Sequence, residues 1–196
     1  MKINRRQALA LVALASVAPA AVRADPVDEG KSEEIERTDR AAGNAEIIRR
    51  QNEAANRGDL AAAVLFLAED TRNHGMPVGR QGVLRVLTDI HNTFPDWHME
   101  IESLAAIGDD VIVRSIVTGT HLGVGKIPVN GGLLVGVPPT GKRFKVQHIH
   151  WSTLKNGLVI EHRATRDDIG MMQQLGLLPA VKRYDLPDVD KPASSG

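Results

Sequence analysis

Apolar residues recur at helical spacing in the first half of this chain and alternate with polar residues in much of the second half. The helical spacing predicts three helices, over residues 41–56, 60–67 and 81–94. Gly58 fits the turn between the first two helices, and Pro95 ends the third because a proline disfavours helical geometry in the residue before it. The N-terminal half is therefore predicted to be helical.

Strand-like alternation begins where this helical pattern ends. It predicts strands over 97–107, 111–121, 143–154 and 158–166, after a short extended piece at 69–74. Asn156-Gly157 is a strong hairpin signal, whereas residues 122–141 are dense in Gly and Pro and predict a loop. A helix beginning near Asp168 ends the pattern. Helices gathered on one side of a curved antiparallel sheet make an α+β layered fold.

The N-terminal segment has the anatomy of a signal peptide. Basic residues Lys2, Arg5 and Arg6 precede an apolar run over 8–22, and Val22-Arg23-Ala24 supplies a small-x-small cleavage site. Residues 4–10 also resemble a twin-arginine export signal, so the protein is expected in the periplasm or outside the cell. We divide the chain into a signal peptide at 1–24, a charged flexible leader at 25–40, a folded domain at 41–178 and a C-terminal tail at 179–196.

Charge and composition exclude several classes of function. The whole chain has 24 basic and 24 acidic residues, and loss of residues 1–24 removes four basic residues and no acidic one. A mildly acidic mature chain with few aromatic residues offers no surface for nucleic acid. The chain has no cysteine, which excludes disulfides, thiol nucleophiles and thiolate metal sites.

Two histidines are predicted to face the interior of the sheet. On the strand over 143–154, alternation puts His148 and His150 on the face that begins with Phe144 and ends with Leu154. They either line a polar patch in a cavity or are core histidines satisfied by backbone or water. Zinc binding by His74, His148, His150, His162 and an Asp is a further alternative. Because H-x-H pairs in strands are common without a metal, we predict no metal.

The C-terminal stretch resembles the signature of the SnoaL-like polyketide cyclase family. That signature is a glycine-turned hairpin, then E-H-W, an aspartate, and G-(L/M)-(L/M)-x-Q-L-G. The matching residues here are Asn156, Gly157, Glu161, His162, Asp167, Gly170, Met171, Met172, Gln174, Leu175 and Gly176. Further matches are Asn73-His74 and the segments 79–83, 94–96, 118–121 and 138–142, with Arg114. Arg163 departs from the family's tryptophan, and the run between His121 and Pro138 is longer than in typical members.

The resemblance implies a fold and a chemistry. The fold is the cone of nuclear transport factor 2-like proteins, with three N-terminal helices packed on a curved antiparallel sheet and a short C-terminal helix. The activity is acid/base catalysis without a cofactor, by aldol-type cyclisation or isomerisation of a small hydrophobic carbonyl compound. Asp167 is the implied acid/base, and His148, His150 and His74 are expected to polarise the carbonyl. The other candidate substrate-binding residues are Asn73, Trp97, Arg114, Glu161 and His162.

Several alternatives remain open at this point. Asp167 also fits a helix N-cap with no chemistry, and it has the opposite strand parity to Leu158, Ile160 and Ala164. The fold equally suits a hydratase or hydrolase, or a non-catalytic binding protein for an apolar ligand. The outer-face residues Ile149 and Trp151 suit a homodimer interface. A carboxylate of Asp167 that faces a cavity favours the enzyme, whereas one directed to solvent or helix amides favours the binder.

Overall fold

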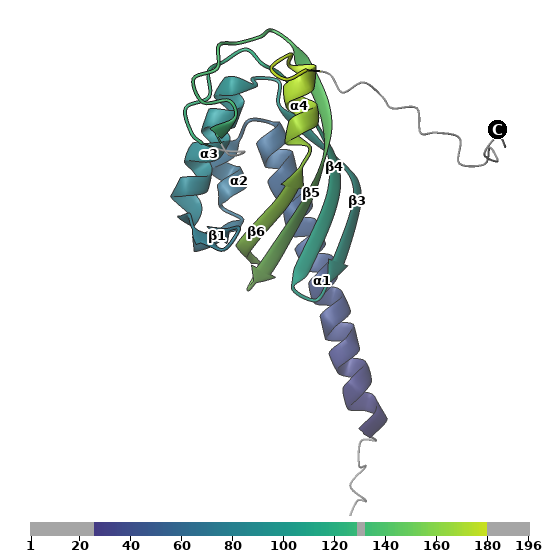
Figure 1. The fold of residues 1–196 in the computed structure, drawn as a ribbon. Helices are drawn as coiled ribbons and strands as arrows, with labels where there is room; N and C mark the ends of the chain where they lie inside the picture. The colour runs from purple at the N-terminus through teal and green to yellow at the C-terminus, as the bar shows by residue number, and fades with distance from the viewer. Residues whose placement is uncertain (1–25, 129–131, 180–196) are drawn as a thin grey trace, which may run out of the picture.

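The described part of the chain folds as helices packed against one side of a curved sheet (Figure 1). The computed structural model describes residues 26–128 and 132–179, so the predicted signal peptide and C-terminal tail lie outside the described residues. The α+β fold class is confirmed. The helices are α1 (Pro26–Asn56), α2 (Leu60–Val64), α3 (Gly79–Thr93) and α4 (Asp168–Gln174), and the strands are β1 (Leu67–Asn73), β2 (Met76–Pro77), β3 (His98–Ile107), β4 (Asp110–Thr120), β5 (Arg143–Lys155) and β6 (Leu158–Arg166).

The sheet has six strands in the order β2-β1-β6-β5-β4-β3. The meander predicted from alternation is present, because β3, β4, β5 and β6 pair in sequence order and antiparallel. β1 joins β6 in parallel, with Asn73 opposite His162. This parallel pair is not visible in the sequence pattern, since β1 and β6 are far apart along the chain.

The first helix is longer than the sequence predicted. We expected a flexible charged leader before residue 41, but α1 begins at Pro26, and its first half extends beyond the end of the sheet (Figure 1). Side chains from Lys31 to Arg40 are exposed, and the first buried side chain is Asn44, which donates to the Gly108 carbonyl at 3.1 Å. Charged side chains favour solvent, so this half makes a helix without a buried face. None of the described helices is long and apolar enough to cross a lipid bilayer.

The second helix is shorter than predicted. The sequence pattern gave a helix over 60–67, but α2 ends at Val64 and Leu67 is already the first residue of β1. Asp59 caps α2 by accepting from the Ala62 amide at 3.1 Å. A continuous apolar run fits a buried helix or a buried strand equally well, and here it is divided between the two.

The described interior contains three apolar clusters, the smallest of which consists of Ala54, Ala55 and Ala63. The α4-end cluster lies beneath the C-terminal helix and consists of Phe94, Val117, Leu134, Phe144, Val146, Met171, Met172 and Leu175. The α1-side cluster lies nearer the start of the domain and consists of Ile48, Val64, Leu67, Val111, Val113, Leu154 and Val159. On the inner face of β5, Val146 belongs to the first cluster and Leu154 to the second. The positions between them are His148, His150 and Ser152, so a polar band separates two apolar regions.

The long loop after β4 is fastened to α3. The buried carboxylate of Asp89 accepts from the Lys126 amide at 3.0 Å and the Ile127 amide at 2.9 Å. Gly123 lies so close to α3 that a Cβ there would overlap the carbonyl oxygen of Asn92. Leu134, further along the loop, is buried in the α4-end cluster. The described parts of this loop are therefore held against α3 and the α4-end cluster.

We expect Asp89→Ala to lower the free energy of unfolding by about 2 kcal/mol, because two loop amides lose their acceptor in a partly buried place. Asp89→Asn retains one acceptor oxygen and should cost about half as much. Urea unfolding monitored by circular dichroism checks both variants. Equal stability of the alanine and asparagine variants would contradict this role for the carboxylate.

Candidate active site

The polar band continues across three neighbouring strands. Strand register puts Ser115 of β4 and Arg166 of β6 on either side of His148. One row further along β5, His150 lies between Val113 and Ala164, and in the row after that Ser152 lies beside His162. His162 is also opposite Asn73 of β1. Residues from four strands therefore meet on one inner wall.

Three side chains of this wall form a hydrogen-bonded chain, which we call the Asn73–His162–His150 chain. The Oδ1 atom of Asn73 lies 2.9 Å from Nδ1 of His162, and Nε2 of His162 lies 3.1 Å from Nδ1 of His150. The ring of His148 is adjacent, with its centroid 5.5 Å from that of His150. The structure thus brings together His148, His150, His162 and Asn73 from the predicted set.

Burial keeps these imidazoles neutral near pH 7. It lowers the pKa of His148 to about 4 and those of His150 and His162 to about 3. The positive charge of Arg166 acts in the same direction on all three, because a nearby cation disfavours protonation. A neutral imidazole can donate one hydrogen bond and accept another without carrying a charge.

Arg166 and Asp168 complete the site, although we did not predict either as a functional residue. Their side chains are about a quarter exposed, and Arg166 Nε lies 3.7 Å from an Asp168 carboxylate oxygen. Arg166 Nε and Asp168 Oδ1 are buried without a hydrogen-bond partner among the described residues. Burial raises the pKa of Asp168, while the Arg166 charge opposes that rise. We call the inner surface formed by His148, His150 and His162 the imidazole wall. One carboxylate and one guanidinium therefore lie at its edge, and each has an atom that can still form a hydrogen bond.

Strand parity could have identified Arg166. It is two residues from Ala164 and four from His162, so all three share one face of β6. The bulge in the β5–β6 pairing between Thr153 and Leu154 shifts Val159 onto that same inner face. Our parity comparison set Asp167 apart from Leu158, Ile160 and Ala164, which agrees with the exposed side chain of Asp167. Arg166 has the same parity as Ala164, but we did not extend the comparison to it.

Asp167 is not placed as expected for a poorly hydrated acid. It is exposed, and its Oδ1 atom accepts from the Gly170 amide at 2.8 Å, which makes it the N-cap of α4. A Cβ at residue 170 would overlap this carboxylate, so glycine in the family signature makes room for the cap. We expected Asp167 to have apolar surroundings, and this expectation was wrong. The half-buried carboxylate at this corner is that of Asp168.

Two further candidates face away from the imidazole wall. Arg114 lies on the outer side of β4, is more than half exposed and pairs with Glu102 at 3.4 Å. Its expected place at a pocket is therefore wrong. Glu161 accepts from the Gly75 amide at 2.8 Å and lies 3.6 Å from Arg163, so it fastens the turn after β1.

The remaining two candidates border the site. His74 has a left-handed backbone with φ of 51°, donates its amide to the His162 carbonyl, and accepts from the Ala164 amide on Nε2 at 3.2 Å. It holds β1 against β6 from an exposed position. Trp97 is partly buried, packs against the α4-end cluster and lies 5.5 Å from the His91 ring. Trp97 thus contributes apolar wall rather than a polar contact to the imidazoles.

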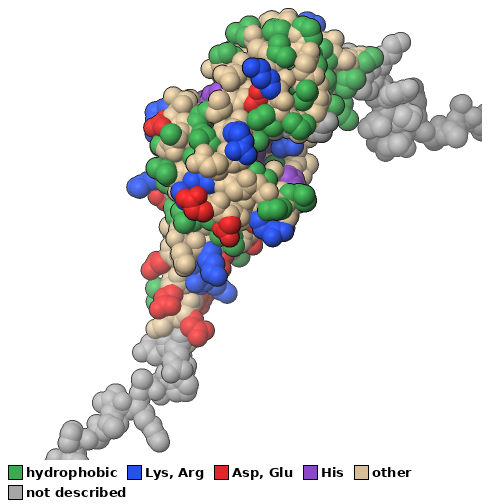
Figure 2. Space-filling model, turned by 90° about the vertical axis from the view of Figure 1, so that its left-hand side faces the viewer, with side chains coloured by type: hydrophobic (Ala, Val, Ile, Leu, Met, Phe, Trp, Pro, Cys, Tyr) green, Lys and Arg blue, Asp and Glu red, His purple; other side chains and the backbone are tan. Residues whose placement is uncertain are grey.

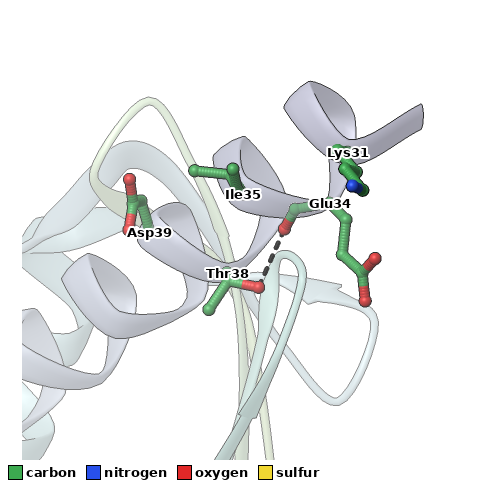
Figure 3. Close-up of a pocket in the computed structure, with 5 residues that line it drawn as sticks. All are labelled: Lys31, Glu34, Ile35, Thr38 and Asp39. Atoms are coloured by element: carbon green, nitrogen blue, oxygen red, sulfur yellow. Dashed lines mark hydrogen bonds between the residues drawn. The ribbon is translucent and has the colours of Figure 1, made fainter. Parts of the chain in front are cut away.

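The surface offers no second site of comparable chemistry on the described residues. Figure 3 shows a hollow on α1 whose lining, Lys31, Glu34, Ile35, Thr38 and Asp39, comes from a single exposed helix. Figure 2 shows acidic and basic side chains interspersed over the face beside α3. Within residues 26–128 and 132–179, no three His, Asp or Glu side chains are arranged to hold a metal ion. Both described hollows lie on α1, and none is described beside Asp167, where we expected one.

Comparison with known proteins identifies the family. Residues 45–175, about two thirds of the chain, match the SnoaL-like polyketide cyclase family. The chain belongs to the SnoaL-like polyketide cyclases. The nogalonic acid methyl ester cyclase of Streptomyces nogalater is 27% identical over 112 residues, which is 57% of this chain and 77% of that protein.

One further relative and one solved structure are similar to this chain over a comparable length. The aklanonic acid methyl ester cyclase DauD of Streptomyces sp. (strain C5) is 28% identical over 138 residues, which covers 67% of this SnoaL-like chain and 80% of DauD. The structure of TsrD from Streptomyces laurentii superposes with a TM-score of 0.60 at 25% identity, covering 70% of this chain and 97% of TsrD. The family match over residues 45–175 runs from the second half of α1 through α4 and thus includes the imidazole wall.

Proposed function

We propose that this SnoaL-like protein is a cofactor-independent cyclase that closes a ring in a small hydrophobic carbonyl compound by an intramolecular aldol reaction. One observation carries the proposal: a half-buried carboxylate, a guanidinium and neutral imidazoles share one inner wall between two apolar clusters. The apolar clusters suit a hydrophobic substrate, and the polar band suits its carbonyl groups. The two curated relatives are named as methyl ester cyclases, which supports the same reaction class.

The proton chemistry is assigned to Asp168. Its carboxylate removes a proton from the carbon next to a carbonyl group, and the carbanion charge moves onto the carbonyl oxygen as an enolate. The enolate carbon then attacks a second carbonyl of the same molecule and forms a carbon–carbon bond. Asp168 returns its proton to the resulting alkoxide, so the product is an isomer of the substrate. A carboxylic acid whose pKa is raised by burial is the better suited of the two neighbouring acids to this exchange.

Stabilisation of the enolate is assigned to Arg166. Its Nε–H group is buried and has no described hydrogen-bond partner, although it lies 3.7 Å from the Asp168 carboxylate, so it can donate to an oxygen on which negative charge develops. His148 lies beside Arg166 in the sheet register and remains neutral, which makes it a second potential donor that adds no competing positive charge. A conjugated substrate also delocalises the charge itself, so few protein groups are needed.

The experiment is a ring-closure assay with the purified chain lacking residues 1–24. Nogalonic and aklanonic acid methyl esters are supplied separately, and chromatography with NMR detects a product of unchanged mass. We expect conversion that is faster than in buffer and that persists after extensive treatment with a chelator. Binding without conversion of either ester would contradict a cyclase acting on this substrate class.

A binding protein is the second candidate, because Asp167 is exposed and satisfied by a helix amide. In that function the wall would hold an apolar ligand without converting it, and the half-buried Asp168 would serve only as a partner for Arg166. The ring-closure assay separates the two candidates when it is combined with a binding measurement on the same esters. A hydratase or hydrolase would instead give a product whose mass differs from that of the substrate by one water.

We also propose that a second copy of the chain covers the outer face of the sheet. Ile149 and Trp151 are nearly half exposed there, and the half-buried Ile112 and Ile116 occupy the same face of the adjacent strand. A sheet face of this kind is self-complementary in a two-fold dimer. Sedimentation of the mature chain should give twice its mass, and Trp151→Glu should give the monomer.

Export to the periplasm or the medium is part of the same proposal. It is supported by the basic start, the apolar run and the small-x-small site within residues 1–24. The mature chain should then begin at Asp25, and mass spectrometry of the exported protein measures this directly. Replacement of Arg5 and Arg6 by lysine should block export if the twin-arginine route is used.

A further inference from the structure

The Nε2 atom of His150 is a buried polar atom without a protein partner. His150 is partly buried, its Nε2 atom is shielded from solvent, and this atom has no hydrogen-bond partner among the described residues. The other ring nitrogen, Nδ1, is engaged with His162 at 3.1 Å. A buried nitrogen that is left unsatisfied costs free energy, so a side chain retained in this state points to a ligand group.

The Asn73–His162–His150 chain decides which kind of hydrogen bond Nε2 can make. Asn73 Oδ1 can only accept, so Nδ1 of His162 carries the proton of that neutral ring. Nε2 of His162 then has the lone pair and accepts from Nδ1–H of His150. His150 is therefore neutral with its proton on Nδ1, which leaves Nε2 as an acceptor.

We propose that Nε2 of His150 accepts a hydrogen bond from a hydroxyl group of the substrate, either a phenol or an enol, and that Asn73 and His162 are positioning residues that hold His150 in the accepting tautomer. The proposal rests on the proposed function, since it takes the imidazole wall as the ligand site. It revises our expectation that His150 polarises a carbonyl, because a carbonyl oxygen and a lone pair on nitrogen are both acceptors and cannot hydrogen-bond to each other.

The groups next to His150 on the wall offer one hydrogen-bond donor and one further acceptor. Arg166 presents a donor at Nε and is one row away on β6, while Asp168 presents an acceptor at Oδ1 beside it. A donor for a carbonyl oxygen and an acceptor for a hydroxyl thus lie on the same wall. A hydroxy ketone or the enol form of a 1,3-dicarbonyl compound matches both. A site of this type discriminates strongly against an analogue that lacks the hydroxyl, because its acceptor is then left unsatisfied.

The tautomer is tested first, by NMR of the mature chain labelled with nitrogen-15 in its histidines. We expect His150 and His162 to show the nitrogen shifts and two-bond couplings of rings protonated at Nδ1. Asn73→Asp retains an oxygen that can only accept and should leave both tautomers unchanged, whereas Asn73→Leu should release them. Protonation of His150 at Nε2 in the wild-type protein would overturn the proposal, and the cyclase function would still stand.

The ligand preference is tested with 2-naphthol and 2-methoxynaphthalene, which differ by one O-methyl group that removes the hydroxyl donor; His150→Phe controls for the added size of the methyl group. We expect the wild-type protein and Asn73→Asp to bind 2-naphthol at least tenfold more tightly, with a shift of the His150 Nε2 resonance. In His150→Phe the two probes should bind within about twofold of each other. Equal affinity of the wild-type protein for both probes, or a naphthol complex that leaves His150 unperturbed, would overturn the proposal. Because neither probe is converted, failure here is distinguishable from failure of the ring-closure assay.

Discussion

Asp168→Asn is expected to lower the turnover number for ring closure by about 10²- to 10⁴-fold, which is the usual range for loss of a positioned acid/base group. The amide has nearly the shape of the carboxylate but cannot remove a proton from carbon. Substrate binding should change little, because Arg166 and the imidazole wall remain. Steady-state kinetics with the ester that the wild-type protein converts measures both quantities, and a loss confined to KM would contradict the assignment.

Asp167→Asn is the matched control for this variant. Asparagine is as good an N-cap as aspartate, so the hydrogen bond to the Gly170 amide and the start of α4 should be retained. We expect turnover within about threefold of wild type, since the Asp167 side chain is exposed and satisfied by the helix. The family resemblance implies the opposite ranking, with Asp167 as the acid/base. A large loss in Asp167→Asn with normal activity in Asp168→Asn would therefore assign the chemistry to Asp167.

Stability separates a catalytic effect of Asp168→Asn from a folding defect. Burial raises the pKa of Asp168, so this carboxyl stabilises the fold only below its unfolded pKa and loses that contribution as the pH rises through its folded pKa. At pH 7 its ionised form is a cost to the fold. Asp168→Asn should consequently be at least as resistant to urea as the wild-type protein at that pH, even though it has lost activity.

The free energy of unfolding is expected to fall by about 4–6 kcal/mol between pH 6.5 and pH 5. Burial holds the pKa of His148 at about 4 and those of His150 and His162 at about 3, whereas the unfolded chain titrates near 6.5. A depressed pKa contributes stability that is present above 6.5 and is lost as the pH falls. Each neutral histidine adds a slope of roughly 1.4 kcal/mol per pH unit in this range. Such a loss is a large part of the stability of an ordinary domain.

Burial sets the sign of this effect, and the charged groups around the three rings modify its size. Arg166 disfavours protonation of all three, His74 does the same for His162, and only Glu161 favours protonation of His162. His162→Gln should make the pH dependence shallower by roughly 1.4 kcal/mol per pH unit. His98, which is exposed on β3, supplies the control His98→Gln, which should leave the slope unchanged. Urea unfolding at a series of pH values measures these slopes, and a flat profile from pH 7 to pH 5 would contradict the burial of the imidazoles.

Sequence patterns predicted much of the fold, because the helical spacing and the strand alternation of apolar residues are regular in most of its elements. The bounds of β6 were predicted as observed, and those of α3, β3, β4 and β5 to within two residues at each end. The predictions for α1 and α2 were less accurate for different reasons. In α1, the charged segment is helical because it continues a helix whose second half is packed against the sheet. In α2, the fully apolar run does not distinguish a helix from a strand.

The site was only partly predictable because two of its determinants are not local. Alternation placed His148 and His150 on the inner wall, since β5 is regular on its inner face from Phe144 to Ser152. Arg166 shares its strand parity with His162 and Ala164, and it was missed because our prediction followed the family signature to Asp167. The choice between Asp167 and Asp168 depends on which carboxylate the first turn of α4 uses as its cap, and adjacent aspartates are equivalent in a sequence motif. The pairing of Asn73 with His162 required the parallel contact of β1 with β6.

A crystal structure of the mature domain with a bound hydroxylated aromatic β-keto ester tests the central claim most directly. We predict that the ligand carbonyl oxygen lies within hydrogen-bond distance of Arg166 Nε and that the acidic carbon faces the Asp168 carboxylate. The ligand ring system should lie against the α4-end cluster. A ligand held on the outer face of the sheet or along α1, or one whose acidic carbon faces only Asp167, would contradict the account.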